Sequence, residues 1–366
     1  MIRNRRTAIG SLALVAAGTL AFWLQNAAAQ QATIGRGLWV GGNNYISEFQ
    51  GNALTKSGKP NAGIAFGSRA FYDPSSIAFD RKNNLWIGFY GAVSGSQPIL
   101  EISRADIAAL KGGAAVRAPV ILRGKGSDNP FVTPASLAFD GAGDLWVADI
   151  GRKGILEFIP KQIARSGAPT AKIFITAPDF VPRAMRFDAS DNLWVTRFQQ
   201  PPSPQQVWRF APGDRAASGP PSPGLMVNIP DGLLPQDLAF DSSGNLWTAG
   251  DDVANANTEV VEMFSASDLS GSGEVSPLPA VTITAFAFGG SFGSSCLNGL
   301  DFDPSGDLWV SVGGANGGCD AANQLVEFTP AQLSTGGNLT PSIVIGQNRR
   351  QTNLYLPGPI RFGPTL

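Results

Sequence analysis

The chain has 366 residues, of which 43% are hydrophobic and 15% charged, and its formal net charge is −1 at pH 7. This composition is typical of a globular protein with a sizeable core. It excludes a disordered chain, which would combine fewer apolar residues with more net charge. The chain contains no histidine. Ser-His-Asp or Cys-His catalysis and histidine-based zinc sites are therefore excluded.

The N-terminal residues have the pattern of a secretory signal peptide. Three arginines within the first six residues precede an apolar stretch over residues 9–24. Small residues at Ala27 and Ala29 then provide the A-x-A pattern of a signal peptidase site. We expect residues 1–29 to be a signal peptide and the mature protein, starting near Gln30, to be secreted or periplasmic. An uncleaved N-terminal anchor is the alternative.

The charge of the mature chain argues against several kinds of partner. Removing residues 1–29 deletes three arginines and no acidic residue, so the mature chain is acidic overall. No dense basic run remains for contact with nucleic acid or an anionic membrane. We expect no nucleic-acid partner, no membrane span after signal cleavage, and a monomeric protein.

One short phrase recurs along the chain. LAFDGAGDLWVAD at residues 137–149 has close copies such as LDFDPSGDLWVSV at 300–312. Apolar and aromatic residues flank a segment rich in Gly, Asn and Asp, which is typical of two strands joined by a hairpin turn. Six tryptophans mark the copies: Trp39, Trp86, Trp146, Trp194, Trp247 and Trp309.

In five copies an aspartate stands six residues before the tryptophan. These residues are Asp80, Asp140, Asp188, Asp241 and Asp303. We expect each carboxylate to accept hydrogen bonds from the amides of its own turn, because such turns need only local backbone groups. A metal-binding or catalytic role is the alternative.

Two more strands follow each copy, as in QLVEF and SIVIG of the last unit, and the insert between them often has the pattern of one helical turn. A glutamate recurs in the third strand, at Glu48, Glu101, Glu157, Glu262 and Glu327. Six units of four antiparallel strands predict an all-β fold, a six-bladed β-propeller that forms a single domain over residues 32–366. The first copy lacks a first strand, whereas residues 358–363 match one. We therefore expect the C-terminal strand to pair with the N-terminal blade and close the ring.

These repeats resemble NHL-type repeats and the blades of streptogramin lyases and of the gluconolactonase/senescence-marker superfamily. NHL-like repeats imply mostly interaction. The gluconolactonase resemblance rests on NGLDF at residues 298–302 and implies that Asn298 is a divalent-metal ligand, with Asp237, Asp149 or Asp251 as oxygen partners. Ca²⁺ would suit such ligands, although the early Glu-Gly-Pro motif of that family is missing here. Streptogramin lyases use a catalytic histidine, which this chain does not have.

A propeller with this repeat gathers its candidate binding residues on one face. Segments that lead into first strands and segments that leave second strands lie together, because those two strands are antiparallel. The residues leading into first strands are Ser75, Ser76, Ala135, Ser136, Arg183, Ala184, Gln236, Asp237, Asn298, Gly299, Gly358 and Pro359. Arg183 and Arg197 share one blade, and both facing the channel would let them bind a carboxylate or phosphate. Pairing with Asp149 or Asp179 is the alternative.

The two cysteines belong to the same face. Cys296 precedes the first strand of the last complete blade, and Cys319 follows its second strand. In an exported protein such a pair favours a disulfide, which would stabilise the fold by about 3 kcal/mol. Two buried thiols are the alternative.

Two functions remain open. The first is a non-catalytic exported propeller that binds a protein, peptide or glycan on its loop face, with Arg183, Arg197, Asp149 and Asp237 as candidate binding residues. The second is a metal-dependent hydrolase of the sugar-lactone type, in which Asn298, Asp237 and Asp251 hold the ion and a metal-bound water attacks the lactone carbonyl.

Overall fold

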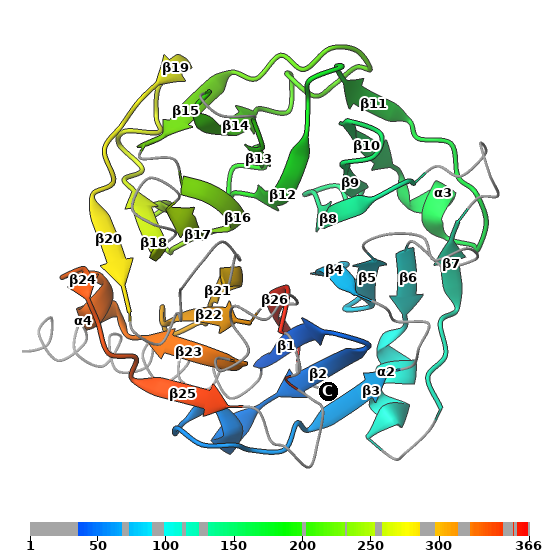
Figure 1. Ribbon diagram of the computed structural model, residues 1–366. Coiled ribbons are helices and arrows are strands. Elements are labelled where there is room, and N and C mark those ends of the chain that lie inside the picture. Colours follow the sequence, from blue (N-terminus) through cyan, green and yellow to red (C-terminus); the bar gives the residue numbers. More distant parts are fainter. Residues whose placement is uncertain are drawn as a thin grey trace, which may run out of the picture.

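The computed structural model describes residues 36–67, 73–89, 99–111, 115–123, 131–199, 203–230, 233–252, 258–285, 297–313, 323–346, 354 and 357–364. They form six β-sheets that follow one another around a central opening (Figure 1). The six-bladed propeller is thus confirmed. The expected signal peptide at residues 1–29 and both cysteines, Cys296 and Cys319, lie outside the described residues.

Each blade is a sheet whose first strand lies innermost. Blades 1 and 2 contain β26 (Ile360–Pro364), β1 (Arg36–Gly42), β2 (Tyr45–Phe49) and β3 (Ile64–Gly67), then β4 (Pro74–Phe79), β5 (Leu85–Phe89), β6 (Ile99–Ile102) and β7 (Val120–Leu122). Blades 3 and 4 contain β8 (Pro134–Phe139), β9 (Leu145–Asp149), β10 (Gly154–Phe158) and β11 (Ile173–Thr176), then β12 (Pro182–Phe187), β13 (Leu193–Arg197), β14 (Gln205–Phe210) and β15 (Leu225–Ile229). Blades 5 and 6 contain β16 (Leu233–Phe240), β17 (Leu246–Asp252), β18 (Thr258–Phe264) and β20 (Val281–Thr284), then β21 (Leu297–Phe302), β22 (Leu308–Val312), β23 (Gln324–Phe328) and β25 (Ile343–Gly346).

The ring closes between the two ends of the propeller. β26 pairs antiparallel with β1, with Phe362 opposite Leu38 and Ile360 opposite Val40. The C-terminal strand therefore supplies the inner strand of blade 1, as predicted. This closure leaves no unpaired inner strand at the junction of blades 1 and 6.

The repeated phrase joins each blade to the next one through aromatic contacts. The tryptophan of every second strand lies edge-on or tilted against the phenylalanine at or near the end of the first strand of the following blade. Ring centroids are 5.5–6.4 Å apart in all six pairs. Trp309 and Phe362 form the pair that spans the closure. Such pairs contribute about 0.5–1.5 kcal/mol each beyond the burial of their area.

The repeated aspartates hold the hairpin turns, as predicted. In blade 2, Asp80 Oδ1 accepts hydrogen bonds from the amides of Lys82 (2.8 Å) and Asn84 (2.9 Å). The other four aspartates accept equivalent amide bonds. In blades 2 to 5 the second carboxylate oxygen also accepts the indole N–H of the blade's tryptophan at 2.8–3.2 Å. The aspartate therefore orients the ring that packs on the next blade.

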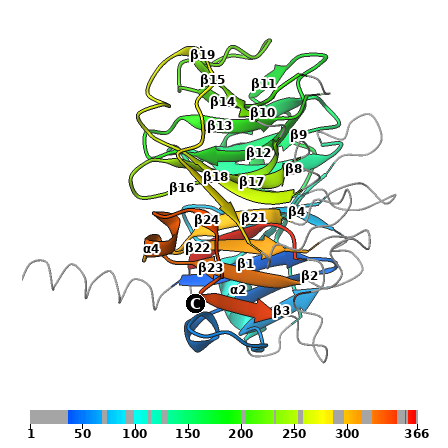
Figure 2. The same ribbon diagram turned by 60° about the vertical axis from the view of Figure 1, so that its left-hand side comes forward.

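The outer rim has a second linkage that the sequence analysis missed. The segment before the fourth strand of one blade runs parallel to the fourth strand of the preceding blade. The pairs are Gly58 with Ile345, Gly167 with Leu122, Gly219 with Ile175, β19 (Gly273–Val275) with β15, and β24 (Gly337–Asn338) with β20. β24 lies on the outside of the ring in both views (Figures 1 and 2). These segments cover sheet edges that would otherwise be open.

Serines fix three of these rim segments. Ser57, Ser166 and Ser218 each precede the paired glycine, and their hydroxyl oxygens accept amide bonds of 2.9–3.0 Å from the neighbouring blade. A recurring Ser-Gly before the fourth strand, as in KSGKP, RSGAP and ASGPP, was the signal in the sequence. The predicted helical turns precede the rim segments as η1 (Gly51–Leu54), α2 (Arg104–Leu110), α3 (Pro160–Ile163) and α4 (Pro330–Leu333).

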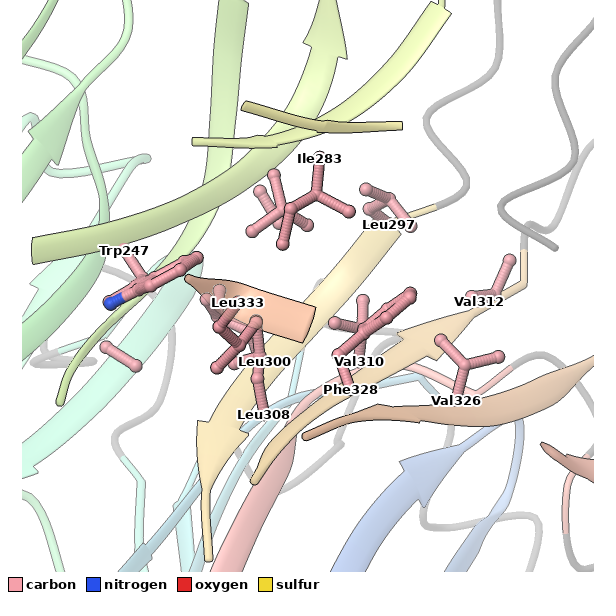
Figure 3. Close-up of a cluster of buried hydrophobic side chains, with 13 residues drawn as sticks. Trp247, Ile283, Leu297, Leu300, Leu308, Val310, Val312, Val326, Phe328 and Leu333 are labelled. Carbon is pink, nitrogen blue, oxygen red and sulfur yellow. The ribbon is translucent and has the colours of Figure 1, made fainter. Parts of the chain in front are cut away.

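The core lies between neighbouring blades and leaves the channel to other residues. Between blades 5 and 6, side chains of Trp247, Ile283, Leu300 and Phe328 pack together with aliphatic neighbours (Figure 3). Leu333 of α4 closes this cluster from outside. Burial of each large apolar side chain stabilises the fold by about 1.5–3 kcal/mol. No helix among the described residues combines the length and apolarity that crossing a bilayer requires.

Candidate ligand site at the channel mouth

A cavity of about 210 Å³ lies at the end of the channel where the inner strands begin, which we call the channel mouth. Its lining comes from all six blades and includes every residue predicted to lead into the first strands except Gly299, together with Asp73, Pro74 and Arg361. The lining residues are Asp73, Pro74, Ser75, Ser76, Ala135, Ser136, Arg183, Ala184, Gln236, Asp237, Asn298, Gly358, Pro359 and Arg361.

Irregular strand pairing brings side chains to the mouth. In five blades the pairing register between the inner strand and the second strand shifts near the mouth. The residues at these bulges are Ser75, Ala135, Arg183, Gln236 and Asn298. A bulged residue is left out of the ladder and its side chain is re-aimed, as often happens beside functional sites. Five of the lining side chains therefore come from positions that the ladder leaves unpaired.

The next residues of the inner strands hold the ring together. Ser76 Oγ accepts the amide of Leu137 at 2.9 Å, and Ser136 Oγ accepts the amide of Met185 at 3.0 Å. Each bond joins one blade to the next. These two serines are buried and engaged, so their role at the mouth is structural.

Below the mouth, two arginines and two aspartates form a charge-balanced group that we call the channel-floor network: Arg186, Asp237, Asp301 and Arg361. Arg361 lies 3.0 Å from Asp237, and Arg186 lies 3.3 Å from Asp301 and 3.8 Å from Asp237. Asp237 also accepts the amides of Leu238 and Leu300. Each charge of the floor therefore has an opposite charge beside it.

Arg186 completes the floor by crossing to two other blades. Its Nε donates to the carbonyl oxygen of Leu238 and its Nη2 to that of Leu300, both at 2.8 Å. Burial, with a further contribution from Arg361, lowers the pKa of Arg186 below its ordinary value. Through these two hydrogen bonds Arg186 holds blades 4, 5 and 6 together.

Three polar side chains at the mouth differ from the floor because they have no hydrogen-bond or ion-pair partner within the part of the chain that the structure describes. They are Arg183, Gln236 and Asp73. Arg183 has only the ring of Phe198, 5.9 Å from its guanidinium carbon. Asp73 precedes β4 with a φ of +54°, a conformation that Asp tolerates better than most residues. The mouth thus presents a free cation, a free anion and a free amide.

Two of the predicted binding residues lie elsewhere and are engaged. Asp149 is fully buried, and its oxygens accept the amides of Val132 (2.7 Å), Thr133 (2.9 Å) and Arg152 (3.0 Å). Asp149 therefore holds the segment that leads into β8 and the turn that follows β9, and it does not line the mouth.

Arg197 pairs with Asp179, which is the alternative that the sequence analysis gave for this arginine. Its guanidinium lies 3.0 Å from Asp179, donates to Gln206 at 3.1 Å and stacks on Trp208 at 4.6 Å. Of the two arginines predicted to bind a ligand together, only Arg183 lines the mouth.

The predicted metal ligands do not come together as a free oxygen cluster. The side-chain amide of Asn298 donates to the carbonyl oxygens of Gly313 and Pro357, and a cation at Asp237 would have to displace Arg361. Asp251 belongs to β17, but its side chain lies outside the described residues. Among the residues described, no group of three or more Cys, Asp or Glu side chains has the spacing to hold a metal ion.

The fold is that of a β-propeller with six blades, and comparisons with known proteins agree. The sequence matches no protein-family description and no curated protein. A protein of unknown function from Bacteroides caccae is 15% identical with a TM-score of 0.54, over 90% of this chain and 99% of that one. A Lactobacillus plantarum protein is 12% identical with a TM-score of 0.51, over 90% and 99%.

Streptogramin-type propellers are also similar in structure. Virginiamycin B lyase from Staphylococcus aureus is 14% identical with a TM-score of 0.43, over 80% of this chain and 78% of that one. At these identities the likeness concerns the fold alone. The lyase activity belongs to that protein.

Proposed function

We propose that this protein is an exported, non-catalytic binding module that holds its ligand at the channel mouth. The observation that carries the proposal is the contrast between floor and mouth. Charges of the channel floor are paired with one another, whereas Arg183, Asp73 and Gln236 at the mouth are unpartnered among the described residues. Binding is favoured when a ligand supplies the missing partners of polar groups that line a cavity.

Binding without chemistry agrees with the side chains at this site. The chain has no histidine, the commonest general base of enzymes. Asp237 is held by Arg361 and by two amides. The sugar-lactone hydrolase has less support, because Asp237 and Asn298 are committed to protein groups at the position where a metal ion would need them.

Export rests on the N-terminal sequence. The arginines, the apolar stretch over residues 9–24 and the small residues Ala27 and Ala29 fit a signal peptide. The propeller would then meet its ligand in the periplasm or outside the cell. A chain that binds extracellular small molecules, peptides or glycans is consistent with this location.

A ligand panel tests the proposal. The purified full chain is screened for thermal stabilisation by amino acids, dipeptides, carboxylates, phosphates, sugars and sugar lactones. A ligand at about 100 times its Kd raises the free energy of unfolding by about 2.7 kcal/mol. The shift must be lost in Arg183→Gln or Gln236→Ala and retained in Arg81→Gln, which lies in the hairpin turn at the opposite end of blade 2.

The same samples separate binding from catalysis. We expect the bound compound to be recovered chemically unchanged after prolonged incubation, as judged by mass spectrometry. Turnover of a lactone that depends on Asn298 would overturn the non-catalytic assignment. Hits that are indifferent to the mouth variants would overturn the site.

A further inference from the structure

The free groups at the mouth carry charges of opposite sign on different blades. Arg183 and Gln236 occupy equivalent bulge positions on the adjacent strands β12 and β16. Asp73 comes immediately before β4, which lies across the central opening from β16 (Figure 1). One side of the mouth thus offers hydrogen-bond donors with a positive charge, and the other offers a carboxylate.

The remaining lining residues do not disturb this arrangement. Ser75 donates its hydroxyl to the carbonyl oxygen of Pro134 at 2.6 Å. Asp237 and Arg361 neutralise each other at 3.0 Å. Ala135 and Gly358 carry no polar side chain. Arg183 and Asp73 are therefore the charges at the mouth that lack a counter-charge among the described residues.

The charge pattern restricts the chemistry of a ligand. A guanidinium next to an amide suits a carboxylate, because both can donate to its oxygens. A ligand with only negative charge would leave Asp73 unpaired and be repelled by it, and a ligand with only positive charge would meet the same problem at Arg183. A ligand with one charge of each sign satisfies both.

The cavity also restricts size. Its volume of about 210 Å³ is below the roughly 300–1,000 Å³ of pockets that hold drug-sized ligands. A molecule with its two charges at opposite ends and few other atoms fits this space.

We infer that the ligand is a small zwitterion, a free α-amino acid or short peptide, whose carboxylate is bound by Arg183 and Gln236 and whose ammonium group faces Asp73. This inference rests on the proposed function of the mouth as a binding site. Desolvation raises the pKa of Asp73 above its ordinary value. An ammonium group beside the carboxylate would lower that pKa again, because it favours the ionised form. Binding should therefore strengthen as the pH rises and Asp73 ionises.

Titration calorimetry with chemically capped ligands tests the inference. The full chain is titrated with free amino acids and dipeptides, with glycylglycine as the reference. Its N-acetyl form, which lacks the ammonium group, and its C-terminal amide, which lacks the carboxylate, serve as matched probes. We expect each cap to weaken binding at least tenfold. Comparison of single amino acids with dipeptides establishes the length of the ligand.

Two variants assign each end of the ligand to its residue. Arg183→Gln should weaken the free dipeptide at least tenfold, and in this variant the C-terminal amide should cause little further loss. Asp73→Asn should also weaken binding of the free dipeptide at least tenfold, and in this variant the N-acetyl cap should cause little further loss. This cross-dependence is the coupling that direct contact requires, and a variant with a disturbed fold would not show it. Arg81→Gln is the control for a change in net charge.

The outcomes separate this inference from the proposed function. Capped and free dipeptides binding equally, or no amino acid or dipeptide binding at all, would overturn the zwitterion. If a sugar or an anion binds instead and depends on the mouth residues, the binding module stands and the zwitterion falls. If every bound compound ignores the mouth variants, both fall.

Discussion

Blades 3 and 6 contain the same three carboxylates but differ in the cations beside them, since in blade 3 Lys172 pairs with two of the acids and Arg215 lies 3.4 Å from the third. Each blade has two aspartates in its hairpin turn and a glutamate opposite its tryptophan. They are Asp140, Asp144 and Glu157 in blade 3 and Asp303, Asp307 and Glu327 in blade 6. The amide of Lys172 donates to the carbonyl of Glu157, and the amide of Ser342 donates to that of Glu327. Lys172 and Ser342 are therefore equivalent residues of the two blades.

The lysine changes the protonation of the cluster. Lys172 Nζ lies 2.6 Å from Glu157 and 3.7 Å from Asp144, so two of the carboxylates in blade 3 share a positive charge. In blade 6, burial and the neighbouring aspartates raise the pKa of Glu327 to about 7. Burial and Asp303 raise the pKa of Asp307 to about 6. Burial raises the pKa of Glu157 as well, but the hydrogen bond and charge of Lys172 oppose that rise, whereas the charges beside Glu327 in blade 6 raise its pKa further.

The largest expected effect is a loss of stability as the pH rises. A carboxyl group whose pKa is about 7 when folded and 4.5 when unfolded keeps its proton longer in the native state, so stability falls between about pH 4.5 and 7. Glu327 and Glu48, whose pKa burial also raises to about 7, contribute about 2–3 kcal/mol each. Urea unfolding at pH 5 and pH 8 measures the difference. Equal stability at both values would contradict these shifts.

The next effect compares the two glutamates directly. Glu327→Gln removes a buried charge without a partner and should stabilise the protein by about 2 kcal/mol at pH 8, with little change at pH 5. Burial raises the pKa of Glu157 as well, but Lys172 opposes that rise, so Glu157→Gln should stabilise the protein less at pH 8 than Glu327→Gln does. Urea unfolding of both variants at pH 8 measures the two gains. Equal gains would show that the lysine does not distinguish the blades.

Removing the lysine should make Glu157 of blade 3 behave more like Glu327 of blade 6. Lys172→Ser leaves Glu157 buried without a cation and should destabilise the protein by about 1 kcal/mol at pH 8. The effect is limited because half of the Lys172 side chain is exposed and its charge is screened. At pH 5 the loss should shrink as Glu157 takes up a proton. A loss of equal size at both pH values would point to packing of the lysine stem instead of charge.

Much of the fold could be predicted because its signals are local and repeated. Asp80 and its counterparts needed only their own turns, and the six tryptophans fixed the number of blades. The rim segments were missed because Ser166 and its equivalents bind a different blade, which a single unit does not reveal. The sequence analysis grouped Glu262 with the other glutamates of the third strands. Those four lie opposite their tryptophans in the ladder, whereas Met263 faces Trp247 and Glu262 faces Thr248.

The candidate site was predicted less completely for a related reason. The topology of antiparallel strands correctly brought Arg183, Gln236 and Asp237 to one face. It could not show that Asp237 would be neutralised by Arg361 from the other end of the chain. Nor could it show that Arg197 would turn toward Asp179. Direction and pairing of side chains depend on contacts between blades, which a repeat pattern leaves undetermined.

The smallest expected effect comes from giving blade 6 the missing lysine. Ser342→Lys should place an ammonium group near Glu327, lower the pKa of that carboxyl, and stabilise the protein by about 0.5–1 kcal/mol at pH 8. The gain should disappear at pH 5, where Glu327 is already protonated. The Ser342 hydroxyl now donates to Gln332 at 2.6 Å, and the loss of this bond offsets part of the gain.

A methionine at the same position separates charge from packing. Ser342→Met adds a comparable apolar stem and loses the same hydroxyl, so only the ammonium group distinguishes it from Ser342→Lys. We expect the lysine variant to exceed the methionine variant at pH 8 and to equal it at pH 5 in urea unfolding. If the two variants agree at both pH values, the charge of Lys172 does not explain why blade 3 differs from blade 6.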